Sequence, residues 1–129
     1  MVVAGLADTS VFIARESGRG IDVDALPERL AVSAITIGEL RAGVLAATDV
    51  DTADRRLSAL QAAMTLDPLP IDGQVAAVWA RLRVALRDEG HRMGVNDSWI
   101  AATALAHDLA IVTQDDDFVD IPGLEVVRV

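Results

Sequence analysis

Four acidic residues stand where elements of a fold are expected to begin or end. Asp8 follows the apolar run 2–7, Asp115 follows the apolar run 109–113, and Glu39 and Asp97 lie in the first turns of two expected helices. If these side chains meet, two like charges ~4 Å apart cost about 4 kcal/mol at an effective dielectric constant of ~20. Such repulsion favours a bound cation. Mg²⁺ and Mn²⁺ bind oxygen ligands and activate water for phosphodiester hydrolysis.

Each of these acids also has a purely structural interpretation. Asp8 and Asp97 are suited to cap the helices that follow them, because their oxygens accept the free N–H groups of a first turn. Glu39 completes a capping box with Thr36. The run 115–117 is compatible with a solvated turn. Taken one at a time, the structural interpretations are favoured. The chemical interpretation depends on four separate segments reaching the same edge of the fold.

The elements expected around these residues alternate between strands and helices. Strands are predicted for 2–7, 31–34, 109–113 and 124–129, and the proline-bounded segment 66–72 is predicted to be an edge strand or an extended piece. Helices are predicted for 9–17, 36–47, 51–65, 73–90 and 96–108, the last capped by Asn96 or Asp97, with a short helix within 18–30. The alternation predicts one α/β domain over residues 1–129 with a mainly parallel sheet. Ligands of such sheets bind at the carboxyl ends of the strands.

The composition excludes several classes of function. The 129 residues have a net charge of −9, and all 11 basic residues are arginine. Without lysine, P-loop nucleotide binding, Schiff-base catalysis and phospho-receiver activity lose their central residue. Without cysteine, disulfides and cysteine-bound zinc are excluded. No apolar run is long enough to span a membrane and no signal peptide is visible, so we expect a cytoplasmic protein without a membrane partner.

Four motifs together resemble the PIN-domain family, and within it the VapC toxins of bacterial toxin–antitoxin pairs. They read ADTSVFI, SAITIGELRAG, VNDSWIAATALAH and LAIVTQDDDF. The resemblance covers nearly the whole chain and implies an α/β/α sandwich around a sheet of four to five strands, with Mg²⁺- or Mn²⁺-dependent endoribonuclease activity. By motif it implies metal-binding or catalytic carboxylates at Asp8, Glu39, Asp97 and Asp115, and a further acidic position at Asp117 that some members use for a second metal ion.

The resemblance also implies supporting residues and partners. Ser10 and Thr113 match hydroxyl positions that hydrogen-bond carboxylates or bound water, whereas Asp116 matches no required position. The implied partners are a structured RNA (tRNA or rRNA), a cognate VapB-type antitoxin and a second copy of the chain in a homodimer. By analogy, a metal-activated water attacks the phosphodiester in line, and Glu39 ligates the metal or orients that water.

An overall charge of −9 disfavours nucleic-acid binding, so a nuclease of this composition must gather its arginines locally. Arg83, Arg87 and Arg92 precede the acidic helix at 96–108, and Arg41 follows the Glu39 motif. These four are candidates for phosphate contacts. The alternative is a set of solvated helix residues.

Two other functions compete with a ribonuclease. One is a PIN-fold module that binds proteins and does not catalyse, and the presence of all four main carboxylates argues against it. The other is a phosphatase of the haloacid-dehalogenase type. That enzyme needs a second acid where this chain has Ser10, and a lysine that the chain lacks.

Overall fold

A four-stranded parallel sheet lies at the centre of the computed structural model, which describes residues 3–118 and 120–129. The elements in chain order are β1 (Ala4–Ala7), α1 (Thr9–Ser17), a 3₁₀ turn (Val23–Ala25), β2 (Arg29–Ala31), α2 (Ala34–Ala46), α3 (Val50–Met64), α4 (Gly73–Asp88), α5 (Val95–Ala106), β3 (Ala110–Thr113) and β4 (Val126–Arg128). The strand order is β2–β1–β3–β4, and each neighbouring pair is parallel. The predicted α/β class is confirmed.

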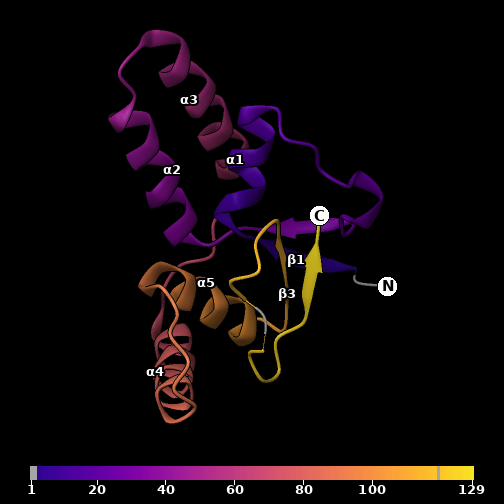
Figure 1. The fold of residues 1–129 in the computed structure, drawn as a ribbon, viewed down its shortest axis with the longest axis vertical. Helices are drawn as coiled ribbons and strands as arrows, with labels where there is room; N and C mark the ends of the chain where they lie inside the picture. Colours follow the sequence, from indigo (N-terminus) through magenta and orange to yellow (C-terminus); the bar gives the residue numbers. More distant parts are fainter. Residues whose placement is uncertain (1–2, 119) are drawn as a thin grey trace.

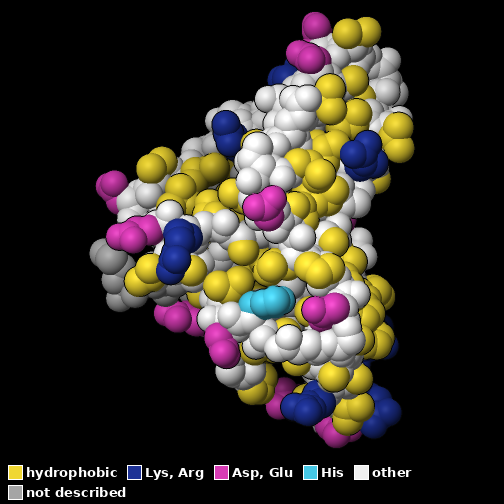
Figure 2. Space-filling view, turned by 180° about the vertical axis from the view of Figure 1, so that it is seen from behind, with side chains coloured by type: hydrophobic (Ala, Val, Ile, Leu, Met, Phe, Trp, Pro, Cys, Tyr) yellow, Lys and Arg dark blue, Asp and Glu magenta, His cyan; other side chains and the backbone are white. Residues whose placement is uncertain are grey.

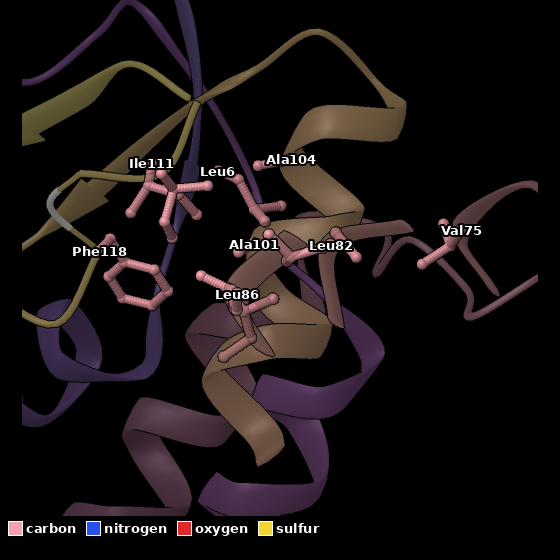
Figure 3. Close-up of a cluster of buried hydrophobic side chains, with 11 residues drawn as sticks. Leu6, Val75, Leu82, Leu86, Ala101, Ala104, Ile111 and Phe118 are labelled. Carbon is pink, nitrogen blue, oxygen red and sulfur yellow. The ribbon is translucent and has the colours of Figure 1, made fainter. Parts of the chain in front are cut away.

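Neighbouring residues on the central strands pack into two separate cores. Leu6 of β1 and Ile111 of β3 pack with α4 and α5, whereas Ala7 and Val112 pack with α1, α2 and α3. Strand side chains alternate between the two faces of a sheet, so helices cover both faces. Figure 3 shows Leu6 and Ile111 on the first of these faces, near Ala101 of α5. This is the predicted α/β/α sandwich.

Helices α2 and α3 lie side by side and extend away from the sheet, with α1 beside them (Figure 1). Arg56 joins the pair, because its Nη1 donates to the carbonyl oxygen of Gly43 at 2.8 Å. The two helix ends that meet at this connection each expose an apolar side chain: Leu45 near the end of α2 is 81% exposed, and Val50 at the start of α3 is 82% exposed. The pair therefore forms an arm whose end has little contact with the rest of the domain.

The structure corrects the prediction at the second strand and the helix that follows it. We predicted a strand over 31–34, but β2 ends at Ala31, and α2 begins at Ala34 instead of at residue 36. The cause is Ser33, whose hydroxyl oxygen accepts the N–H of Ile35 at 3.1 Å and so caps the helix. A small polar residue that looked like part of a strand is the start of the helix.

Residues 32–34 leave the sheet because they pair with the proline-bounded segment. Leu69 donates its N–H to the carbonyl oxygen of Val32 at 2.8 Å, and Ala34 donates its N–H to the carbonyl oxygen of Leu69 at 2.9 Å. The segment 66–72 is thus an extended piece with an isolated bridge, the second of the two predicted forms.

The other predicted elements are present, with boundaries within two residues of those expected. Residue 2, the predicted start of the first strand, lies outside the described residues. Within the described part of the chain, no helix is long and apolar enough to cross a membrane.

Candidate active site

Asp8 is buried at the carboxyl end of β1, where only 3% of its surface is exposed. Its Oδ1 accepts the N–H of Ser10 at 3.1 Å and the Ser10 hydroxyl at 2.5 Å, and its Oδ2 accepts the Thr113 hydroxyl at 2.7 Å. Burial raises the pKa of Asp8, the hydrogen bonds from Ser10 and Thr113 lower it in part, and the charge of Asp115 raises it further. The predicted cap of α1 is confirmed, and the same carboxylate is bound from a second strand.

The ends of β1 and β3 lie side by side because the two strands are paired in parallel. The Thr113 hydroxyl, which donates to Asp8, accepts the N–H of Asp115 at 3.0 Å. The Ser10 hydroxyl accepts the N–H of Gln114 at 3.0 Å. Two hydroxyls therefore fix the backbone after β3 against the carboxylate at the end of β1.

Glu39 lies in the second turn of α2 and does not cap the helix. The predicted capping box of Thr36 and Glu39 is wrong, because Ser33 is the cap residue. Thr36 is fully buried, and its hydroxyl lies 3.0 Å from the hydroxyl of Thr9. The carboxylate of Glu39 is left to interact outside its own helix.

Two residues from other segments donate hydrogen bonds to Glu39. The Thr9 hydroxyl donates to its Oε1 at 2.6 Å, and the Asn96 amide donates to its Oε2 at 3.4 Å. Our sequence reasoning gave neither donor a role in the site. The available signal was position alone, since Thr9 directly follows Asp8 and Asn96 directly precedes Asp97.

Asp97 lies in the first turn of α5, and the expectation that it or Asn96 caps this helix is wrong. Gly94 is the cap residue, and no side chain accepts the free N–H groups there. Among the described residues, the Asp97 carboxylate accepts no hydrogen bond. Its pKa is raised to about 6, first by burial and then by the charges of four other acids, which are Asp117, Asp8, Glu39 and Asp115.

The five acids named from the sequence therefore act on one another, and we call them the acidic cluster: Asp8, Glu39, Asp97, Asp115 and Asp117. Within the described ranges, no arginine forms an ion pair with any of them. Carboxylate oxygens without a counter-charge are the donors that Mg²⁺ and Mn²⁺ prefer, so the donor set fits a hard divalent cation. Yet in residues 3–118 and 120–129 no three Asp, Glu or His side chains are already arranged as a metal-ligand group.

The remaining candidates occupy other surfaces. Arg83, Arg87 and Arg92 line one pocket beside the start of α5, whereas Arg41 is exposed on α2. Asp116 is exposed and forms an ion pair with Arg128, and it is not among the acids that shift the pKa of Asp97. The predicted arginines are thus divided between two places.

A comparison with known families decides the class of this fold. The model of the PIN domain matches residues 6–124. The chain belongs to the PIN-domain family. Among curated proteins, Ribonuclease VapC5 of Mycobacterium tuberculosis is 46% identical over 129 residues, which cover 98% of this chain and 96% of that protein. Ribonuclease VapC4 of the same organism is 49% identical over 129 residues, which cover 96% of this chain and 95% of that protein. These relatives place this PIN domain among the VapC proteins.

Solved structures agree with this placement of the PIN domain. A crystal structure of a member of the VapBC family of toxin–antitoxin systems, VapBC-5 from M. tuberculosis, aligns with a TM-score of 0.89 at 42% identity, over 98% of this chain and 99% of that chain. FitAcB from Neisseria gonorrhoeae aligns with a TM-score of 0.76 at 30% identity, over 95% of each chain. The family resemblance of the four motifs is confirmed.

Proposed function

We propose that this PIN domain is a metal-dependent endoribonuclease, the toxin of a type II toxin–antitoxin pair, and that it hydrolyses phosphodiester bonds in structured RNA. The main support is the acidic cluster, in which burial and then the charges of four other carboxylates raise the pKa of Asp97 to about 6. Repulsion of this kind destabilises a fold, and a bound cation removes it. The relatives named as ribonucleases support the reaction class.

The carboxylates have separate roles in this proposal. Mg²⁺ or Mn²⁺, when bound, supplies an activated water and neutralises charge on the scissile phosphate. Asp8, Asp97 and Asp115 would hold the ion directly or through water, and Asp117 is available for a second ion. Glu39 would ligate the ion or orient the attacking water.

The hydroxyls keep these carboxylates in place and charged. Ser10 and Thr113 donate to Asp8 and favour its ionised form against the effect of burial. Thr9 donates to Glu39 and limits the orientation of that carboxylate. Neighbours that orient metal ligands often matter nearly as much as the ligands.

The substrate and partners follow from the family. We propose tRNA or rRNA as the substrate class, with 5′-phosphate and 3′-hydroxyl products, and a homodimer inhibited by a VapB-type antitoxin. The VapBC-5 and FitAcB structures support an antitoxin partner. A groove of about 240 Å³ between α1 and the arm supports it too, because apolar side chains line it beside charged Glu16 and Arg56 and it reaches Glu39; the apolar residues are Ile13, Leu40 and Ala59.

The test is cleavage of bulk tRNA and rRNA by the purified chain with Mg²⁺, with Mn²⁺ or with EDTA. We expect cleavage with either metal and none with EDTA, and Asp97→Asn should lose at least ~100-fold in rate, about 2.7 kcal/mol of transition-state stabilisation. The matched control is Asp116→Asn, which makes the same change on an exposed residue outside the acidic cluster. It should cleave like the unmodified chain.

Three further readouts separate the proposal from its competitor, a PIN fold that only binds proteins. Mn²⁺ should raise the melting temperature of the unmodified chain more than that of Asp97→Asn. Expression should arrest growth, and co-expression of the antitoxin should relieve the arrest. Equal cleavage by both variants would reject the catalytic assignment. A chain that captures its antitoxin but cleaves no RNA under any metal would support the protein-binding module.

A further inference from the structure

A pocket of about 700 Å³ lies between the end of α4 and the start of α5, outside the acidic cluster. Its lining includes four basic or titratable side chains, Arg83, Arg87, Arg92 and His91. The chain has a net charge of −9, yet among the described residues that line this pocket none is Asp or Glu. At the lower end of the molecule in Figure 2, where Figure 1 shows α4, arginine side chains lie beside acidic ones. The pocket is a local positive surface on an acidic protein.

Arg83 is fixed in this pocket without losing its charge. Its guanidinium lies over the ring of Trp79, 5.1 Å from the centroid, and that ring stacks on Trp99 at 4.2 Å with 2° between the planes. A cation–π contact holds a guanidinium but leaves its N–H donors free, whereas an ion pair would occupy them. Arg87 does meet Asp88 at 3.6 Å, but their side chains are 75% and 66% exposed, so this pair is weak.

The pocket is connected to the acidic cluster through the first turn of α5. Ser98 lines the pocket and directly follows Asp97. Its hydroxyl accepts the indole N–H of Trp79 at 2.9 Å and donates to the carbonyl oxygen of Val95 at 2.5 Å. The stack and the turn that carries Asp97 are therefore one hydrogen-bonded unit. A molecule bound in the pocket contacts the helical turn that carries Asp97.

We propose that this pocket binds phosphates of the RNA strand next to the scissile bond, an inference that rests on the proposed ribonuclease function. A guanidinium pairs with two phosphate oxygens at once, and three of them along one pocket suit a polyanion. The contacts are to the backbone, so the pocket positions RNA and does not read its sequence. The alternative is that the pocket binds an acidic surface of another protein, and the test below distinguishes the two.

The test is fluorescence anisotropy of a labelled RNA hairpin, titrated in EDTA so that no cleavage occurs, at several salt concentrations. The variant R83Q/R87Q/R92Q is compared with R15Q/R19Q/R81Q, which removes the same charge from exposed arginines outside this pocket. We expect the first variant to bind the hairpin at least about tenfold more weakly. The slope of the logarithm of its binding constant against the logarithm of the salt concentration should become shallower by about 2, since each single-strand phosphate contact contributes about 0.7. The second should stay within about twofold of the unmodified chain.

Two additions keep the outcome clear. R87Q/R92Q leaves the tryptophan stack untouched, so it reports on the pocket even if the triple variant does not fold. The chain has 2 Trp and no Tyr, so quenching of intrinsic fluorescence by the hairpin reports binding beside the stack.

Equal weakening by both triple variants, or failure of the unmodified chain to bind the hairpin at low salt, would overturn the proposal. A changed sedimentation coefficient with unchanged RNA affinity would assign the pocket to a protein interface instead. Because binding is measured without metal, this result is independent of the cleavage assay. If Asp97→Asn cleaves normally, the ribonuclease site fails while the pocket result stands.

Discussion

The acidic cluster has two halves. In the strand half, Asp8 and Asp115 lie at the ends of β1 and β3. The hydroxyls of Ser10 and Thr113 form hydrogen bonds with both of these segments. In the other half, the helix half, Glu39 and Asp97 lie on α2 and α5. Among the described residues Asp97 accepts no hydrogen bond, and the second donor to Glu39, Asn96, is 3.4 Å away. The buried carboxylate of Asp8 and the backbone of Asp115 are therefore tied to both strands, whereas the support of the helix half is one short bond, from Thr9 to Glu39.

This difference indicates how the site works. The strand half is set by the fold before any cation binds, because its hydroxyl donors are buried or half-buried with the carboxylate. In the helix half the pKa of Asp97 is raised, first by burial and then by the charges of four other acids, and no three acids in the described ranges form a ready ligand group. Under the proposed function, the carboxylates of the strand half would hold a divalent cation first, and those of the helix half would complete its ligands.

Thr113→Val is the strongest test of the strand half. Valine has the shape of threonine but removes the donor to Asp8 and the acceptor for the N–H of Asp115, at a site with 0% exposure. A buried carboxylate that loses a donor costs about 2 kcal/mol, so the midpoint of urea unfolding should fall accordingly. Thr113→Ser, which keeps the hydroxyl, should unfold near the unmodified chain. If valine and serine behave alike, the hydroxyl does not support the strand half.

The strand half is also the part of the site that local sequence patterns predict well. An acid within two residues of a buried apolar run marks the end of a parallel strand, and this rule places Asp8 and Asp115 at one edge. The hydroxyls Ser10 and Thr113 lie close to these acids in the sequence, so their contacts are within reach of a motif.

Local sequence patterns do not predict the helix half, because its contacts join residues that are far apart in the sequence. The cap of α2 moves to Ser33 since the backbone beside it pairs with Leu69, which no local pattern shows. Thr9 binds Glu39 across 30 positions of sequence. The capping preferences we used for Glu39 and Asp97 are real but weak, and tertiary contacts override them.

Thr9→Val tests whether the helix half needs its one short hydrogen bond. The change removes the 2.6 Å bond to Glu39 at a half-buried position, so it should alter stability little. We expect RNA cleavage to fall about tenfold, as is typical when a residue that orients a metal-site carboxylate is lost. Thr9→Ser should restore cleavage to within about twofold. A normal rate for the valine variant would show that Glu39 is positioned by the cation alone.

The pH dependence of stability tests the repulsion in the helix half, and it is the smallest effect. The pKa of Asp97 is raised to about 6 from its ordinary value of 3.8. Between about pH 4 and pH 6 the folded state therefore holds more protons than the unfolded state, and the free energy of unfolding falls as the pH rises. Asp97 is partly exposed, so screening limits the loss to about 1 kcal/mol, complete above about pH 6.

Asp97→Asn should remove this loss, so in EDTA the variant should be the more stable protein at pH 7 and the equal of the unmodified chain near pH 4. Urea unfolding across this range measures the difference, with Asp116→Asn as the control that shows no such trend. With saturating Mn²⁺ at pH 7, the unmodified chain should instead be more stable than Asp97→Asn, because a cation offsets the repulsion only where the carboxylate is present. A difference that does not change with pH or Mn²⁺ would mean that the helix half is as firmly set by the fold as the strand half.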